Sequence, residues 1–173
     1  MKIVNRVYKG RLQQSVDLRL ISLKIPGSEL HIVKPSQVMV KTESGASCLI
    51  FSKGAIRLMG AANVESIEDA REIIDKEVLH WWTHEKCPEL VIQTMTITHS
   101  LPQPINLVKF HKFVNSQYEF ELFSGLRLTK YPKICANLFS SGKLVLCGIK
   151  TEDEAENVIK DIYAIYNTYA TRS

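Results

Sequence analysis

The stretch that decides the fold is CANLFSSGKLVLCG at residues 135–148, because its pattern occurs a second time as SCLIFSKGAIRLMG at residues 47–60. Phe and Gly positions of the two stretches match at one offset, since 139 − 51 = 88 and 148 − 60 = 88. Each stretch is typical of a β-hairpin, with a strand ending at the Phe, a turn containing Gly, and a strand ending at the next Gly. The repetition predicts a fold built from two similar halves.

The match continues on both sides of the hairpins. Acidic, helix-patterned segments follow them, SIEDAREIIDKEVLHWW at residues 66–82 and TEDEAENVIKDIYAIY at residues 151–166, and each opens with Ser or Thr before acids, as a helix N-cap favours. Ahead of the hairpins, VDL at residues 16–18 matches INL at residues 105–107. Each half is therefore predicted to run strand, short helix, strands, long helix.

We expect residues 1–87 to form the first repeat and residues 88–173 the second, as one continuous structural unit. Side chains alternate across a strand, so each hairpin has two faces. One face can be buried under the long helices. The other is still largely apolar without further helices to cover it, which indicates an interaction surface; dimerisation is the alternative. The buried set is predicted to be Cys48, Ile50, Ile56, Leu58, Ala136, Leu138, Leu144 and Leu146, and the uncovered set Leu49, Phe51, Arg57, Met59, Asn137, Phe139, Val145 and Cys147.

Composition narrows the class of protein. Of the 173 residues, 45% are hydrophobic and 23% charged, which is typical of a globular protein, and the net charge of +4 permits nucleic-acid binding without establishing it. No segment approaches the roughly 20 apolar residues of a membrane span, and the first residues do not resemble a signal peptide, so we expect an intracellular protein. The four cysteines form no C-x-x-C pair and are expected to be free thiols.

Catalytic motifs are missing from the sequence. It contains no G-x-S-x-G, P-loop or G-x-G-x-x-G pattern. His80 and His84 have the i, i+4 spacing of metal ligands, but they lack the adjacent Glu of a zinc protease and any Cys at ligand spacing. We therefore expect a protein that is not an enzyme and that holds no metal or cofactor.

The second half resembles the C-terminal repeat of TATA-box-binding proteins. VIQTMTITHSLPQPINL at residues 91–107 is similar to that family's opening strand and short helix, and YEFELFSGLRLTKYPKI at residues 118–134 to its stirrup loop and following strand. NLFSSGKLVLCGIKTEDEA at residues 137–155 continues the similarity into the last helix. The first half matches mainly in VDLRLISLK at residues 16–24 and LIFSKG at residues 49–54, so the resemblance covers nearly the whole chain.

The resemblance implies an α+β saddle of two pseudo-symmetric repeats, with a curved antiparallel ten-stranded sheet and four helices on its convex side. The concave side would sit on the minor groove of promoter DNA, in agreement with the uncovered apolar face. Proteins of this kind insert apolar wedges between base steps and kink the duplex. The implied function is that of a general transcription initiation factor, located in the nucleus or in a viral or host transcription compartment.

Phenylalanines carry the implied wedges. Phe123 and Phe139 match the family's pair in the second repeat, and Phe51 matches the hairpin Phe of the first. The partner of Phe51 should lie near Lys34, yet residues 30–35 contain no Phe. An aliphatic substitute could come from Leu30, Ile32 or Val33.

Departures from the family cluster on the implied DNA face. Asn5 keeps the family's base-contacting Asn, whereas Thr94 replaces it in the second repeat, and Met59 and Cys147 replace its paired threonines. Arg57 replaces a small apolar residue; it could favour narrow A·T minor grooves or contact phosphate. Strict TATA recognition is therefore in doubt. The complete DNA-binding set is predicted to be Asn5, Val7, Leu49, Phe51, Arg57, Met59, Thr94, Thr96, Phe123, Asn137, Phe139, Val145 and Cys147.

Protein partners are implied by the stirrup loops. Glu119, Glu121 and Leu122 match positions through which the family binds transcription factor IIB. The first-half stirrup at residues 26–35, the family's site for transcription factor IIA, is poorly matched. The implied partners are A·T-rich double-stranded promoter DNA, a factor IIB-like protein, a factor IIA-like protein and the RNA polymerase machinery. The alternative function is a related saddle that serves mainly as a protein-interaction module with weak or altered DNA binding.

Overall fold

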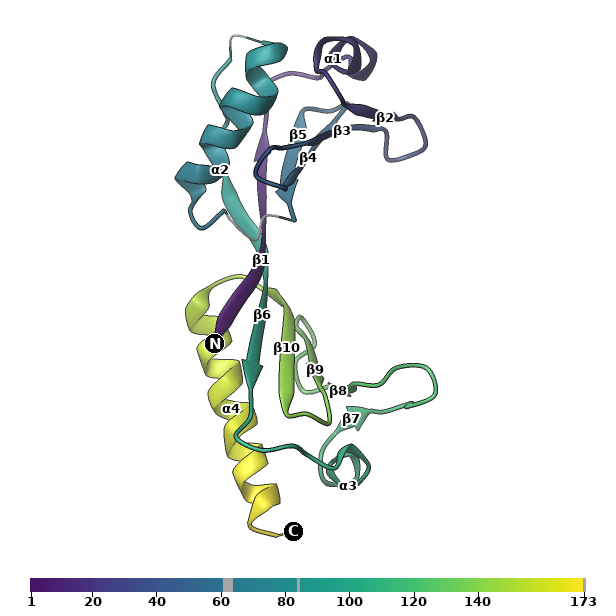
Figure 1. Ribbon diagram of the computed structural model, residues 1–173, viewed down its shortest axis with the longest axis vertical. Helices are drawn as coiled ribbons and strands as arrows, with labels where there is room; N and C mark the ends of the chain where they lie inside the picture. Colours follow the sequence, from purple (N-terminus) through teal and green to yellow (C-terminus); the bar gives the residue numbers. More distant parts are fainter. Residues whose placement is uncertain (61–63, 84, 173) are drawn as a thin grey trace. The chain divides into compact units, whose positions relative to one another are not determined.

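The computed structural model describes residues 1–60, 64–83 and 85–172. Ten strands form one antiparallel sheet in the order β2-β3-β4-β5-β1-β6-β10-β9-β8-β7, and four α-helices accompany them (Figure 1). The chain divides into two compact units, one of Asn5–Gln93 and one of Met1–Val4 with Thr94–Ser173. The α+β class and the ten-stranded sheet with four helices are confirmed.

Each repeat has the same order of elements. The first contains β1 (Lys2–Arg11), α1 (Leu18–Lys24), β2 (Glu29–His31), β3 (Gln37–Lys41), β4 (Ser47–Phe51), β5 (Ala55–Met59) and α2 (Ile67–Ile73). A wider π-helical turn (Ile74–Val78) and a 3₁₀ turn (Leu79–Trp81) extend α2. The second contains β6 (Val91–Ser100), α3 (Leu107–Phe113), β7 (Ser116–Gln117), β8 (Leu126–Leu128), β9 (Cys135–Leu138), β10 (Lys143–Ile149) and α4 (Glu152–Ala170).

Capping side chains begin the helices where the sequence predicts. Asp17 accepts a hydrogen bond from the backbone N–H of Arg19 at 2.9 Å, and Asn106 caps α3 in the matching position. Ser66 begins α2 with a reciprocal capping box, and the Thr151 hydroxyl caps α4. The helix expected over residues 66–82 changes to the π and 3₁₀ turns after Ile73, whereas the one expected over residues 151–166 continues to Ala170.

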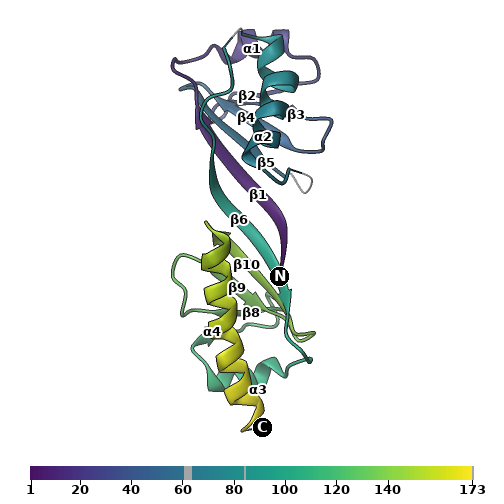
Figure 2. The ribbon, with the colours of Figure 1, turned by 90° about the vertical axis from the view of Figure 1, so that its left-hand side faces the viewer.

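Alternation along the strands builds the core of each unit. The eight hairpin residues predicted to be buried are all fully buried, and Figure 2 shows α4 lying across the face of β8, β9 and β10 that carries four of them. On the opposite face the hairpin side chains are half-buried or exposed except Leu49, which is only 9% exposed. Leu49 lies directly between Met39 and Arg57 in the strand register, so its neighbours on both strands cover it.

A polar cluster joins α4 to the loop after β8. Asp161 accepts hydrogen bonds from the Lys130 ammonium, at 2.7 Å, and from the Tyr131 hydroxyl. The hydrogen bond from Lys130 and, to a smaller extent, the one from the Tyr131 hydroxyl hold the pKa of Asp161 below its usual value. Burial, with the neighbouring carboxylate, raises the pKa of Tyr131. Since all three side chains stand near the surface, the cluster is a modest contribution to stability.

Replacing Asp161 by Asn should make stability less dependent on acid pH. A carboxyl whose pKa is lowered by folding stabilises the protein above its unfolded pKa of about 4, and that contribution disappears as the pH falls through the folded value. We expect the free energy of unfolding of the wild-type protein to exceed that of Asp161→Asn by up to about 1 kcal/mol at neutral pH. This difference should shrink below about pH 4. Urea unfolding over a pH series measures this. A constant difference at every pH would contradict it.

Within residues 1–60, 64–83 and 85–172, no helix has the length and apolar character needed to cross a membrane. Cys48, Cys87, Cys135 and Cys147 are free thiols, as expected.

Candidate nucleic-acid interface

The face turned away from the helices carries a row of side chains in the first repeat. Strand register places Lys9 of β1 opposite Arg57 of β5, Arg57 opposite Leu49 of β4, and Leu49 opposite Met39 of β3. Residues directly opposite on neighbouring strands share a face. Asn5 belongs to the same face by alternation along β1, because Tyr8 points into the core.

The second repeat carries an equivalent row. Thr98 of β6 lies opposite Val145 of β10, Val145 opposite Asn137 of β9, and Asn137 opposite Arg127 of β8. Two residues further along β10, and on the same face, Cys147 lies between Thr96 of β6 and Cys135 of β9. The predicted interface residues of each repeat are thus neighbours. Sequence analysis missed the following face residues, which the same period-two alternation in the flanking strands would have found: Lys9, Met39, Thr98, Arg127 and Cys135.

Polar atoms near the middle of the strands are incompletely bonded. Asn5 is half-buried, and its side-chain Oδ1 is buried without a hydrogen-bond partner in the part of the chain that the structure describes. A buried acceptor without a donor costs free energy, which a donor from a ligand would recover. Thr94 and Val7 are half-buried.

Two aromatic rings stand together at one end of the second repeat. Phe123, in the loop between β7 and β8, is 45% exposed, and its ring contacts Phe139 at the end of β9 with centroids 5.7 Å apart and planes at 71°. This T-shaped geometry is favourable for aromatic pairs. Gly125 makes room for them, since a Cβ atom there would lie 2.6 Å from a ring carbon of Phe123 and 3.0 Å from one of Phe139.

The first repeat has a different arrangement at the matching end. Val38 faces the core opposite Ile50, and Leu126 faces the core opposite Leu138. These pairs are related by the offset of the hairpins, since 126 − 38 = 88 and 138 − 50 = 88. The same offset pairs Gly125 with Gln37, which lies opposite Phe51. Gln37 therefore carries a side chain where the second repeat has the space that holds two rings.

Phe51 accordingly has a cation rather than a ring beside it. The Arg57 guanidinium carbon lies 5.5 Å from the centroid of the Phe51 ring, a cation–π contact. Of the three aliphatic residues predicted as substitute wedges, Leu30 packs against the core and is therefore not one. Ile32 and Val33 are exposed in the loop between β2 and β3, Val33 by 85%.

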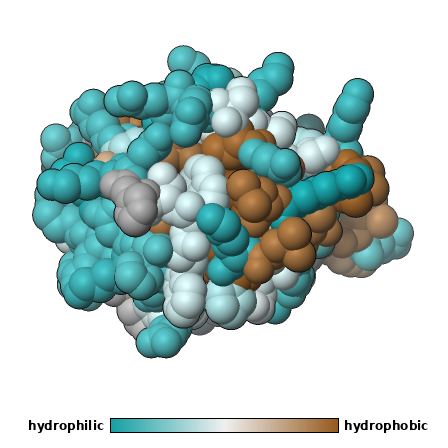
Figure 3. All heavy atoms as spheres, turned by 90° about the horizontal axis from the view of Figure 1, so that it is seen from above, coloured by the Kyte–Doolittle hydropathy of each residue, from teal (hydrophilic) through white to brown (hydrophobic). Residues whose placement is uncertain are grey.

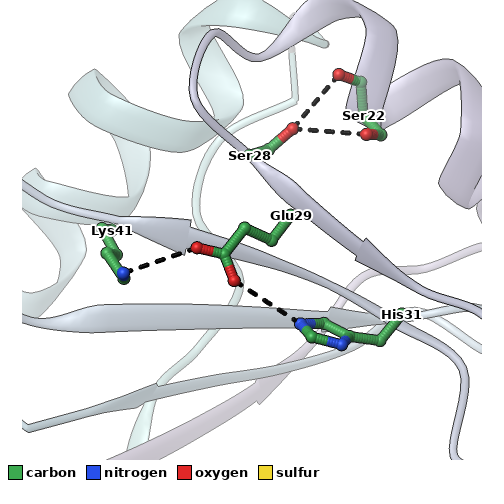
Figure 4. A network of polar contacts seen from close by, with 5 residues as sticks. All are labelled: Ser22, Ser28, Glu29, His31 and Lys41. Atoms are coloured by element: carbon green, nitrogen blue, oxygen red, sulfur yellow. Dashed lines mark hydrogen bonds and ion pairs between the residues drawn. The ribbon is translucent and has the colours of Figure 1, made fainter.

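Polar contacts hold the base of that loop, as Figure 4 shows. The Glu29 carboxylate lies 3.4 Å from the Lys41 ammonium on β3 and 3.8 Å from His31 Nε2. The Ser28 hydroxyl donates to the Ser22 carbonyl of α1 at 3.1 Å. Strand β2 is thereby tied to both α1 and β3, which positions the exposed residues that follow it.

The second-repeat loop presents the predicted partner-binding residues. Glu119, Glu121 and Leu122 are all exposed, Leu122 by 82%. Backbone N–H groups of Leu122 and Phe123 both donate to the Glu119 carbonyl at 2.9 Å, so one turn of chain shapes the loop. Phe120 is also exposed, and sequence analysis missed it.

A second apolar surface lies outside the sheet. Leu20 and Leu23 of α1 are exposed, Leu23 by 86%, and Figure 3 shows hydrophobic side chains gathered on this end of the molecule. Sequence analysis missed these residues because the segment was matched to the family as a whole. The available signal was helical spacing, since Leu20 and Leu23 each lie two residues after the buried Leu18 or Ile21 and so turn away from the buried face of α1.

The structure describes one of the two histidines with metal-ligand spacing. His80 packs its ring against Trp81, and His84 lies outside the described residues. Among the residues whose placement is described, His, Cys, Asp and Glu form no group of three that could hold a metal ion.

Two repeats in one sheet, with helices over one face and rings, cations and polar groups on the other, are typical of a DNA-binding transcription factor. The family model described as transcription factor TFIID, or TATA-binding protein (TBP), matches residues 1–79 and 89–169. The chain therefore belongs to the TATA-binding protein family, whose members are DNA-binding transcription factors and not enzymes.

Similar proteins come from archaea. The TATA-box-binding protein of Methanocaldococcus jannaschii is 32% identical over 167 residues, which cover 94% of this chain and 91% of that protein. The TATA-box-binding protein of Thermoplasma acidophilum is 30% identical over 163 residues, which cover 91% of this chain and 89% of that protein. The solved structure of Methanococcus jannaschii TBP superposes with a TM-score of 0.83 at 28% identity, covering 96% of this chain and 98% of that one. The predicted family is confirmed, while the individual interface residues stay predictions.

Substituting Gly125 by Ala should separate the two rings without unfolding the protein. The new Cβ would overlap the Phe123 ring at 2.6 Å, and the backbone of Gly125 does not need the left-handed conformation that only glycine tolerates well. We expect affinity for an A·T-rich duplex to fall about three- to tenfold, equivalent to about 1 kcal/mol, with a small change in the urea midpoint. Fluorescence anisotropy and urea unfolding measure the two quantities.

The control for this substitution is Ser124→Ala, in the adjacent exposed position. Equal affinity of Gly125→Ala and the wild-type protein would show that the ring pair does not contact DNA.

Proposed function

We propose that this protein is a promoter-binding transcription initiation factor that binds duplex DNA through the minor groove, kinks it, and recruits a transcription factor IIB-like protein. The observation that carries the proposal is the Phe123–Phe139 pair with Gly125 beside it. Two adjoining aromatic rings at the end of a sheet are unusual unless they bind something, because exposed aromatic surface is costly. Their edge-on arrangement is a preformed wedge for a base step.

The rest of the face supports minor-groove binding. Val7, Val145 and Cys147 supply apolar surface for the sugar edges and base edges of a widened groove, while Asn5 supplies a hydrogen-bonding group. The minor groove distinguishes A·T from G·C mainly by the guanine amino group. A face with few donors for specific bases therefore selects sequence mostly by deformability, which favours A·T-rich sites with flexible TA steps.

Recruitment of a partner rests on the loop between β7 and β8. Glu119 and Glu121 provide two carboxylates beside the exposed Leu122, a combination that suits a basic partner surface with an apolar contact. The same loop carries Phe123, so DNA and partner would bind on adjoining sides of it. A factor IIA-like protein would use residues 26–35, and RNA polymerase would follow through these factors. Nuclear localisation stays a prediction, since the similar proteins named above are archaeal.

A second function is favoured by other observations. Met59 and Thr94 replace groups that contact bases in the family, and the first repeat lacks a paired ring beside Phe51. These features suit a saddle that acts mainly as a protein-interaction module with weak DNA binding.

A panel of short duplexes, TATA-containing and scrambled, distinguishes the two functions. Fluorescent labels at the duplex ends report bending, and affinity is measured across a salt series. We expect the wild-type protein to bend A·T-rich duplexes, and Phe123→Ala/Phe139→Ala to lose at least tenfold in affinity together with the bend, because the wedge is removed. Phe120→Ala, an exposed Phe of the same loop outside the ring pair, is the matched control and should bend DNA like the wild-type protein.

Binding at the non-specific level only, or equal bending by the double variant, would reject the kinking mechanism and leave the protein-interaction function.

A further inference from the structure

A basic hollow lies beside the β4–β5 hairpin of the first repeat. Its cations come from four separate elements: Arg11 at the end of β1, Lys34 in the loop after β2, Lys53 in the turn between β4 and β5, and Arg57 in β5. Phe51 forms part of its wall, and no Asp or Glu lines it. All four cations are exposed, and none forms an ion pair with a residue that the structure describes.

Local contacts position two of these side chains and the loop that carries a third. Arg57 is placed by its contact with the Phe51 ring, and Arg11 donates to the Lys53 carbonyl at 3.4 Å. The loop that carries Lys34 is closed by a hydrogen bond from the Ser36 hydroxyl to the Ile32 carbonyl at 2.9 Å. Four like charges that line one hollow without a carboxylate attract an anion, and because they are exposed this attraction weakens as salt is added.

The second repeat serves as an internal comparison. By the offset of 88 that relates the hairpins and loops, Lys53 corresponds to Ser141, Arg57 to Val145 and Lys34 to Leu122. The same offset relates Ala55 to Lys143, since 143 − 55 = 88. Arg11 lies opposite Ala55 and Ser100 lies opposite Lys143, so Arg11 corresponds to Ser100. None of the four counterparts is charged. The one cation gained there is Lys143, at the position of Ala55.

A neighbouring cation extends the charge toward the middle of the face. Lys9 lies directly opposite Arg57, and its counterpart in the second repeat is Thr98, opposite Val145. The charge therefore accumulates on the face that the proposed function assigns to DNA, at the end where the second ring is missing.

We propose that this hollow binds phosphates of the DNA backbone and holds the first-repeat end of the duplex by charge, where the second-repeat end is held by a two-ring wedge. The inference rests on the proposed function. Arginine and lysine side chains are the usual ligands of backbone phosphate, and such contacts carry no sequence information. The first-repeat end then contributes affinity and the second-repeat end contributes most of the kink.

Salt dependence tests the inference, because each phosphate contact releases counterions and adds about 0.9 to the slope of log affinity against log salt. The variant Arg11→Ser/Lys53→Ser/Arg57→Val introduces the residues that the second repeat carries at the corresponding positions, which the same fold accommodates. We expect its slope on an A·T-rich duplex to be shallower by about 2 to 3 and its bending signal to persist at saturation. Arg57→Gln/Lys53→Gln is the second variant if the first fails to fold.

The matched control removes three charges elsewhere. Lys24→Gln/Lys109→Gln/Lys112→Gln changes exposed lysines of α1 and α3 and should leave the slope within about 1 of the wild-type value. An equal loss of slope in the control would mean that net charge, and not the hollow, determines binding, and would overturn the inference.

The remaining outcomes are separable. No duplex binding by the wild-type protein would reject the proposed function itself. Wild-type binding with an unchanged slope in the triple variant would overturn only the phosphate assignment. If the triple variant lost the wild-type protein's binding to a polyglutamate peptide but kept its DNA binding, the hollow would be reassigned to an acidic protein segment.

Discussion

One constraint underlies this structure: each repeat has helices for only one face of its strands. Because side chains alternate with a period of two, placing Leu58 and Leu146 in the core necessarily turns Arg57 and Val145 the other way. Burial of the first set supplies most of the stability. The second set is left half-exposed by the fold itself, and a largely apolar face in that position is available for a ligand. The alternation that builds the core thus also creates the candidate DNA-binding surface.

The same constraint explains why the repeats agree in the core and differ on the face. Core positions such as Ile50 and Leu138 must fill similar spaces beneath similar helices, and close packing tolerates little change there. On the other face no helix covers the side chains, so positions such as Gln37 and Gly125 can differ when the residues around them differ too. Gly125 leaves space for a second ring beside the hairpin Phe, whereas the first repeat has Gln37 at that position and Pro35 where the second repeat has Phe123. The two ends therefore have different chemistry on a common scaffold.

Much of the fold was predictable from local patterns. The hairpins, the caps at Ser66 and Thr151 and the buried hairpin residues all followed from periodicity and capping chemistry, which act over a few residues. Burial of Leu49 and the space provided by Gly125 did not, because both depend on which residues lie opposite on neighbouring strands. The basic hollow was equally hidden, since its four cations come from four elements. Register, which long-range pairing determines, was the missing information.

A duplicated protein on duplex DNA faces a problem of direction, because two equal halves would bind a nearly symmetric site equally well in either orientation. Only a difference between the halves can separate the two orientations in free energy. In the proposed binding mode, rings such as Phe123 and Phe139 would gain free energy when the base step beneath them unstacks easily, which depends on sequence. Cations such as Arg57 and Lys53 would gain free energy from phosphate, which is the same at every base step. A site with its most deformable step at one end would therefore be bound with the ring pair over that step and the cations over the stiffer end.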